Sequence, residues 1–224
     1  MLLEIPLLDA DEARSLGERL KSADWIDGNV TSGPGAALAK RNRQMPETGA
    51  AAIEAREMIQ KALAASGQFL SAALPRKVYP PLFNRYGIGE GFGEHIDNAI
   101  RVDHAGGQMR TDLSATVFLC DPDTYEGGAL EIETPCGRIT RKLGAGQMLL
   151  YPATSLHRVT PVTKGERICS FFWMESLVRD ESARATLFDL DQSVQALALD
   201  RGGDDREVLR LTKVYHNLVR RWTT

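Results

Sequence analysis

Hydrophobic residues recur at helical spacing near the start of the chain. Ala13, Leu16 and Leu20 share one face of a helix, because residues three and four apart stack along the same side. Asp9 precedes this pattern, and Glu12 follows three residues later, as in the capping box that begins many helices. The pattern predicts a first helix soon after Asp9.

A second helix is predicted after a break in the pattern. Glycine and proline interrupt the chain around residues 31–35, and residues 50–65 are then rich in Ala, Glu, Lys, Met and Leu, which favour helices. We expect this helix to continue towards Leu74.

From about Val78 the spacing changes to that of strands. Seven short apolar or β-branched runs alternate with turns, and they read LFNRY, DLSATVFLC, ALEIE, GRITR, QMLLY, HRVTPV and RICSFFW. This many short strands in succession indicates an antiparallel sandwich or barrel.

After Glu175 helical spacing returns in two stretches separated by a glycine-containing turn at residues 201–204. Their apolar stripes consist of Leu187, Leu190, Val194 and Leu197, and of Val208, Leu211, Tyr215, Leu218 and Trp222. A helical hairpin is predicted, packed on the core or on a second subunit. The expected organisation is an N-terminal helical region (1–77), a β core (78–177) and a C-terminal helical extension (178–224), an α+β arrangement with a mainly β core.

Composition and charge narrow the classes of function. Hydrophobic residues make up 43% and charged residues 25%, as in ordinary globular proteins. The net charge of -3 and the lack of a long basic run argue against nucleic-acid binding. The start lacks a basic segment followed by a long apolar core, and no run of apolar residues is long enough to span a membrane. We therefore expect a cytoplasmic protein.

Three residues form a candidate metal site. His95 and Asp97 are two apart in GFGEHIDNAI, and residues two apart on an extended strand point to the same side. His157 opens the run HRVTPV, and a barrel brings the ends of distant strands together. Two histidines and one carboxylate suit iron(II) and leave coordination positions open, whereas structural zinc prefers a closed tetrahedron. His104 and His216 are interpreted as non-ligands.

Arg167 supplies a candidate anion site. It lies ten positions after His157, across the turn TKGE, so that neighbouring strands can present a ligand and a cation to one cavity. A guanidinium binds a carboxylate with two parallel hydrogen bonds, which suits the far end of a dicarboxylate chelated to iron. The alternative is a solvated turn residue beside Glu166.

Two further features have less specific interpretations. Asn84 and Tyr86 share a strand face just before the metal motif and are candidate contacts for a co-substrate, although core packing explains Tyr86 equally well. Residues 98–110 contain two adjacent glycines and form either a mobile lid over the site or a plain surface loop.

Four stretches of the chain have a further significance: FNRYGIGEGFGEHIDNAI, RTDLSATVFLCDPDTYEGGAL, LLYPATSLHRVTPVTKGERICSFFW and KVYHNLVRRW. They resemble the iron(II)- and 2-oxoglutarate-dependent dioxygenases, and in particular the PKHD-type hydroxylases, bacterial relatives of prolyl 4-hydroxylase. The resemblance implies a double-stranded β-helix (jelly-roll) core over residues 78–177. It also implies that His95, Asp97 and His157 bind iron, that Arg167 binds 2-oxoglutarate, and that ascorbate serves as reductant.

The function expected from this resemblance is hydroxylation of an unidentified substrate, coupled to conversion of 2-oxoglutarate and dioxygen to succinate and carbon dioxide. An N-demethylase of the same fold and a non-catalytic jelly-roll that senses iron or an oxo-acid remain as alternatives. The substrate is left open between a peptidyl residue and a small molecule, including one linked to iron uptake. A homodimer through the C-terminal helices is a further possibility.

Overall fold

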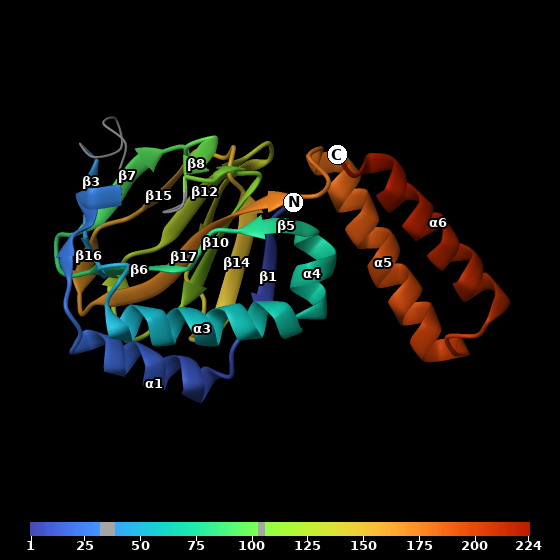
Figure 1. Cartoon of the computed structure of the whole chain (residues 1–224). Helices are drawn as coiled ribbons and strands as arrows, with labels where there is room; N and C mark the ends of the chain where they lie inside the picture. The colour runs from blue at the N-terminus through green and yellow to red at the C-terminus, as the bar shows by residue number, and fades with distance from the viewer. Residues whose placement is uncertain (32–38, 103–105) are drawn as a thin grey trace.

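Two antiparallel sheets face each other in the computed structural model, which describes residues 1–31, 39–102 and 106–224 (Figure 1). The larger sheet has eight strands, in the order β1 (Leu3–Pro6), β14 (Gln147–Pro152), β10 (Leu113–Phe118), β17 (Arg167–Ser176), β6 (Leu82–Tyr86), β4 (Arg43–Gln44) and β2 (Ile26–Asp27), with β5 (Pro75–Val78) also paired to β17. The smaller sheet has five strands, in the order β13 (Gly137–Arg141), β12 (Leu130–Thr134), β15 (His157–Val159), β7 (Gly91–His95) and β3 (Lys40–Arg41). This arrangement confirms the predicted antiparallel core.

Two short strand pairs and the helices complete the fold. The pairs are β8 (Ile100–Val102) with β9 (Gln108–Arg110), and β11 (Glu126–Gly127) with β16 (Val162–Lys164). The helices are α1 (Ala10–Lys21), the 3-10 turn η1 (Gly28–Thr31), α3 (Ala50–Ala65), α4 (Gly67–Ala73), α5 (Glu181–Arg201) and α6 (Arg206–Trp222). None of the helices in the described part of the chain has the length and hydropathy that a transmembrane span requires.

The larger sheet is buried on both faces, and its strands alternate between two environments. In β10, Leu113 and Ala115 belong to the core shared with α1, α3 and α4. Ser114 and Thr116 point the other way and line a pocket between the sheets. Because side chains on a strand alternate between faces, one strand builds both the core and the pocket wall.

The first predicted helix is confirmed, and it covers the outer face of the larger sheet together with α3 (Figure 1). The Asp9 side chain accepts hydrogen bonds from the backbone nitrogens of Asp11 and Glu12, which satisfies two otherwise free donors at the start of α1.

The second predicted helix is divided in two. Ser66 interrupts it with an extended backbone (ψ 100°), and its hydroxyl accepts a hydrogen bond from the backbone nitrogen of Phe69 to begin α4. α4 then ends at Leu74, whose left-handed backbone (φ 41°) stops the helix. The prediction of one continuous helix up to Leu74 is therefore wrong at Ser66, because serine favours a helix cap over a helix interior.

Strand β7, which ends at His95, is not among the seven runs predicted as strands from their apolar pattern, because its sequence GFGEH is rich in glycine. The extended backbone assumed for the metal motif is present up to His95. The glycines reflect close approach of neighbouring chain segments. A Cβ atom on Gly91 would lie 2.9 Å from the carbonyl oxygen of Val159, and one on Gly93 would lie 2.9 Å from Cβ of Ala39. Glycine thus allows β7 to fit tightly between its neighbours β15 and β3.

The predicted C-terminal hairpin is also present, and it projects from the side of the sandwich (Figure 1). α5 contacts α4 at its N-terminal end, where Leu187 and Phe188 are buried. The Ser71 hydroxyl donates a hydrogen bond to the Asp191 carboxylate across the same contact, over 2.6 Å. The hairpin is therefore attached at one end and free along most of its length. The domain boundaries at residues 77 and 177 remain predictions.

Candidate active site

The two histidines of the candidate metal site lie side by side on neighbouring strands. His95 ends β7 and His157 begins β15, and the two residues face each other in the register of the smaller sheet. Their ring centroids are 4.2 Å apart. Strand pairing thus brings together two residues that are far apart in the sequence.

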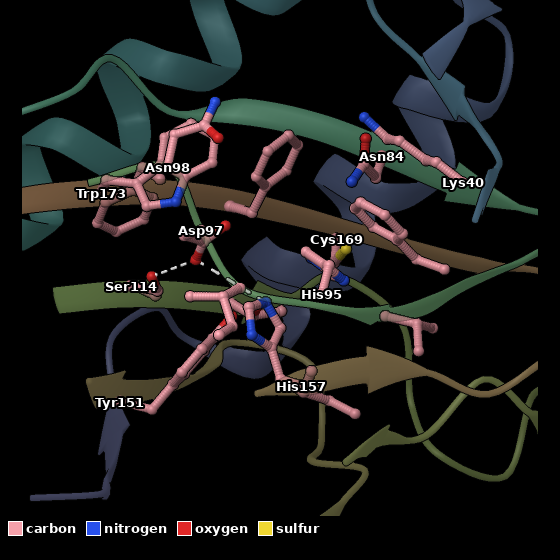
Figure 2. A pocket seen from close by; sticks show the side chains of 18 of the residues that line it. Lys40, Asn84, His95, Asp97, Asn98, Ser114, Tyr151, His157, Cys169 and Trp173 are labelled. Carbon is pink, nitrogen blue, oxygen red and sulfur yellow. Dashed lines mark hydrogen bonds and ion pairs between the residues drawn. The ribbon is translucent and has the colours of Figure 1, made fainter. Parts of the chain in front are cut away.

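Asp97 follows β7 and completes the cluster (Figure 2). Its Oδ2 atom lies 3.8 Å from Nε2 of His157 and accepts a 2.6 Å hydrogen bond from the Ser114 hydroxyl of the opposite sheet. One potential ligand atom from each of His95, Asp97 and His157 lies within 4.8 Å of the other two. The three residues expected to hold a metal therefore converge, and they can bind one ion together.

Backbone contacts orient both imidazole rings. Nδ1 of His95 lies 2.8 Å from the carbonyl oxygen of Gly93, and Nδ1 of His157 lies 3.0 Å from that of Ser155. A carbonyl oxygen can only accept, so each Nδ1 donates to it and Nε2 is the ring nitrogen that remains for a metal. Metal-binding histidines commonly have this arrangement, in which one ring nitrogen donates to a fixed acceptor.

The surroundings keep the imidazole of His95 neutral. Burial, and then the neighbouring His157, lower the pKa of His95 to about 4. Phe92 stacks on the His95 ring with centroids 3.5 Å apart, which further restricts water. At neutral pH the His95 ring is therefore available to a metal ion without prior loss of a proton.

Arg167 is buried at the start of β17, with 1% of its surface exposed. The interpretation as a solvated turn residue is therefore wrong. Its Nε and Nη1 atoms have no hydrogen-bond partner among the described residues, and the guanidinium lies over the rings of Tyr86 and Phe118. Buried donors without a partner are costly, so this geometry fits an anionic ligand that supplies the missing acceptors.

Asn84 and Tyr86 lie in the same pocket, on β6 beside β17. The Asn84 amide donates a 3.3 Å hydrogen bond to the Tyr86 hydroxyl, while Oδ1 of Asn84 has no partner among the described residues. Burial raises the pKa of Tyr86 to about 12, so its hydroxyl stays protonated and can donate. Both residues line the pocket that also contains the two histidines and Arg167.

The segment interpreted as a lid or a surface loop is partly ordered as strands. β8 and β9 pair within residues 98–110, with Arg101 opposite Met109. Residues 103–105, including His104, lie outside the described part of the chain. His216 is exposed on α6, far along the chain from the cluster, as expected for a non-ligand.

Several pocket residues were missed from the sequence. Ser114 and Thr116 are polar residues two apart in an otherwise apolar strand, which is a signal that this face borders a polar site. Tyr125 lies outside this pocket lining but close to Arg167, and burial raises the pKa of its hydroxyl. Lys40 and Arg101 also line the pocket, but neither forms part of a sequence motif.

The donor set has a defined chemistry. Two imidazoles and one carboxylate form a site that leaves positions free on an octahedral metal, and iron(II) in oxygenases is held in this way. A buried guanidinium in the same pocket suits the distal carboxylate of an oxo-diacid. The residues present therefore fit both iron and 2-oxoglutarate.

Comparisons with known proteins agree with this chemistry. The 2OG-Fe(II) oxygenase superfamily matches residues 81–175, and the PKHD-type hydroxylase C-terminal domain matches residues 181–224. A PKHD-type hydroxylase of Rhizorhabdus wittichii is 59% identical over 95% of this chain and 92% of its own length. Another from Methylobacillus flagellatus is 52% identical over 99% of both chains.

Solved structures share the fold at low identity. A Pseudomonas putida prolyl-4-hydroxylase aligns with a TM-score of 0.55 and 18% identity, covering 78% of this chain and 92% of the other. The epimerase SnoN from nogalamycin biosynthesis aligns with a TM-score of 0.54 and 20% identity, covering 79% and 78%. These likenesses confirm the expected jelly-roll class, while the full-length relatives establish the family. The chain belongs to the PKHD-type hydroxylases within the 2OG-Fe(II) oxygenase superfamily, and it is a 2-oxoglutarate-dependent dioxygenase.

Proposed function

We propose that His95, Asp97 and His157 hold the catalytic iron(II) and that Arg167 binds the distal carboxylate of 2-oxoglutarate. One observation carries this assignment: the ligand atoms of the three residues lie within 4.8 Å of one another in the pocket that contains Arg167. The primary substrate would occupy the outer part of the same pocket.

When bound, iron and 2-oxoglutarate supply the oxidising chemistry, in which 2-oxoglutarate and dioxygen yield succinate, carbon dioxide and a hydroxylated substrate. His95 and His157 would contribute imidazole nitrogens to the metal, and Asp97 would contribute a carboxylate oxygen held in place by Ser114. Arg167 fixes the orientation of the dicarboxylate through its planar fork. Aromatic walls exclude water, which strengthens these polar contacts.

Asn84 and Tyr86 are proposed to contact 2-oxoglutarate as hydrogen-bond donors. Both line the pocket, and Tyr86 lies opposite Arg167 in the pairing of β6 with β17. Ascorbate is proposed as the reductant that restores iron to the ferrous state, on the ground of the family resemblance alone.

The direct test is spectroscopic. Under anaerobic conditions the protein with iron(II) and 2-oxoglutarate should develop a metal-to-ligand charge-transfer band, and admission of air should produce succinate. His157→Ala should abolish both signals, because one of three protein ligands is lost. His216→Ala, which removes an exposed histidine of α6, is the matched control and should retain both.

Arg167→Ala separates the co-substrate site from the metal site. We expect much weaker 2-oxoglutarate binding with iron affinity retained, since the guanidinium contacts the anion and not the metal. Arg221→Ala on α6 controls for loss of an exposed arginine. A charge-transfer band in the unmodified protein without succinate would favour the non-catalytic sensor, and absence of both signals would refute the site assignment.

The primary substrate is proposed to be a peptidyl residue or a small molecule, with a metabolite of iron uptake as one candidate. Structures with the same fold include a prolyl hydroxylase in complex with a peptide fragment and HygX with hygromycin B bound, so the fold admits both classes.

We further propose a cytoplasmic homodimer joined through the projecting hairpin. Leu199 and Leu209 near the hairpin tip are 91% and 55% exposed, which supports a contact with a second copy. Light scattering should give twice the chain mass of 24.6 kDa, and Leu209→Asp should give the monomer. A monomeric unmodified protein would refute the dimer.

A further inference from the structure

Arg101 lies at the outer part of the pocket, on the short strand β8. Its guanidinium carbon is 3.9 Å from the ring centroid of Trp173 and 5.1 Å from that of Tyr79. Both rings are nearly buried, with 6% and 5% of their surfaces exposed. Stacking on two buried rings holds the plane of the guanidinium, and no hydrogen bond from its nitrogens to another described residue competes with a ligand.

This platform is connected to the proposed metal site through one pair of facing residues. Trp173 on β17 lies opposite Ser114 on β10, and the Ser114 hydroxyl binds Asp97. Figure 2 shows Trp173, Ser114 and Asp97 around the same opening. A group held by Arg101 would therefore belong to a molecule that lies beside the metal ligands.

No carboxylate of the described residues lies within ion-pair distance of Arg101. Asp97 is the only acidic residue among the described residues lining the pocket, whereas Lys40, Arg101 and Arg167 are basic. Iron(II) and 2-oxoglutarate carry opposite charges of equal size, so loading the site does not offset this excess. Among the described lining residues, basic side chains therefore outnumber acidic ones by two.

The positive charges act on one another. Burial, followed by the charge of Arg101, lowers the pKa of Lys40 to about 8. Lys40 is 4% exposed, and its Nζ donates to the carbonyl oxygen of Gly28 over 2.7 Å. A negatively charged group in the pocket would relieve this repulsion. The guanidinium of Arg101 is placed to donate hydrogen bonds to such a group directly.

We infer that Arg101 binds a carboxylate on the primary substrate, next to the site of hydroxylation. This inference rests on the proposed function and specifies the substrate class as an acid. A carboxylate matches the planar fork of the guanidinium with two parallel hydrogen bonds. It would be distinct from the 2-oxoglutarate carboxylate, which is assigned to Arg167 at the start of β17, six residues before Trp173 on the same strand.

The test uses a matched pair of probes on the full-length protein loaded anaerobically with iron(II) and 2-oxoglutarate. N-acetylglycine carries a carboxylate, and N-acetylglycine amide has nearly the same shape without the charge. Calorimetric titration should show saturable binding of the acid, with the amide bound about tenfold more weakly or worse. The charge-transfer band recorded beforehand reports the proposed function separately, since its absence identifies a failure of that assignment.

Variants then locate the contact. Arg101→Gln should weaken acid binding about tenfold or more and remove the preference for acid over amide, whereas Arg101→Lys should keep part of it because the charge remains. Arg221→Gln on α6 controls for a general change in charge. Failure of the unmodified protein to prefer the acid, or an unchanged preference in Arg101→Gln, would overturn the inference. If Arg101→Gln does not fold, Arg101→Lys is measured instead. An acid-to-amide ratio equal to that of the unmodified protein would then overturn the inference.

Discussion

Asp97 depends on a residue of the opposite sheet for its orientation. The Ser114 hydroxyl donates a 2.6 Å hydrogen bond to Oδ2 of Asp97, the same atom that faces His157. Partners that orient metal ligands typically change metal affinity by about 10- to 100-fold. We therefore expect Ser114→Ala to weaken iron(II) binding about tenfold, measured by metal titration under anaerobic conditions.

Ser170 provides a control for the loss of a buried hydroxyl in the same sheet. It is fully buried on β17 and donates to the carbonyl oxygen of Leu82, away from the metal ligands. Ser170→Ala should affect stability without the specific loss of metal affinity. Equal iron affinities for Ser114→Ala and Ser170→Ala would contradict the role of Ser114.

Lys40 should make the free energy of unfolding depend on pH. Its pKa is about 8 in the folded protein and 10.5 in the unfolded chain, so between these values the unfolded chain binds more protons. Stability then rises with pH across this interval, by up to roughly 3 kcal/mol. Urea unfolding at pH 8 and pH 10.5 should show this rise relative to Lys40→Met, which lacks the titrating group. A constant difference between the two proteins would contradict a depressed pKa.

At the residue scale, motifs were predictable and their surroundings were not. His95, Asp97, His157 and Arg167 stand in a recognisable order along the chain, and all four line one pocket. Lys40 and Arg101 enter the pocket from β3 and β8, whose two- and three-residue lengths carry no periodic signal. Their contribution depends on tertiary packing alone.

At the scale of elements, α5 depends on a few buried side chains near its start. Leu187 is fully buried, whereas Leu199 on the same helix is 91% exposed. Leu187→Ala should lower the free energy of unfolding by about 2–5 kcal/mol, because it leaves a cavity in the contact that attaches the hairpin. Leu199→Ala should change it little. Similar values in urea unfolding for the two variants would show that the hairpin is not held at Leu187.

The strands that could be predicted are those with continuous apolar runs. β10, β14 and β17 form the middle of the larger sheet, where both faces are covered, and their sequences are accordingly apolar. β7 has no apolar run to mark it, because its glycines serve close packing and not strand propensity. The helix break at Ser66 was missed for a related reason, since one capping hydrogen bond decides it.

At the scale of the molecule, the proposed ligands connect the two sheets. His95 and His157 belong to the smaller sheet, whereas Arg167 belongs to the larger one. A metal ion alone would bind mainly to the smaller sheet and the adjoining Asp97. 2-Oxoglutarate would extend from the metal to Arg167 and join the two sheets across the pocket.

This geometry predicts that the metal and then 2-oxoglutarate each raise the stability of the protein, in that order. Cobalt(II), used as an air-stable substitute for iron, should raise the melting temperature, and 2-oxoglutarate should raise it again only when the metal is present. A ligand at a hundredfold excess over its dissociation constant contributes about 2.7 kcal/mol. Arg167→Gln should keep the increment from cobalt and lose that from 2-oxoglutarate, whereas His157→Ala should lose both. Stabilisation by 2-oxoglutarate without metal, or an undiminished second increment in Arg167→Gln, would show that the co-substrate does not bridge the sheets at this site.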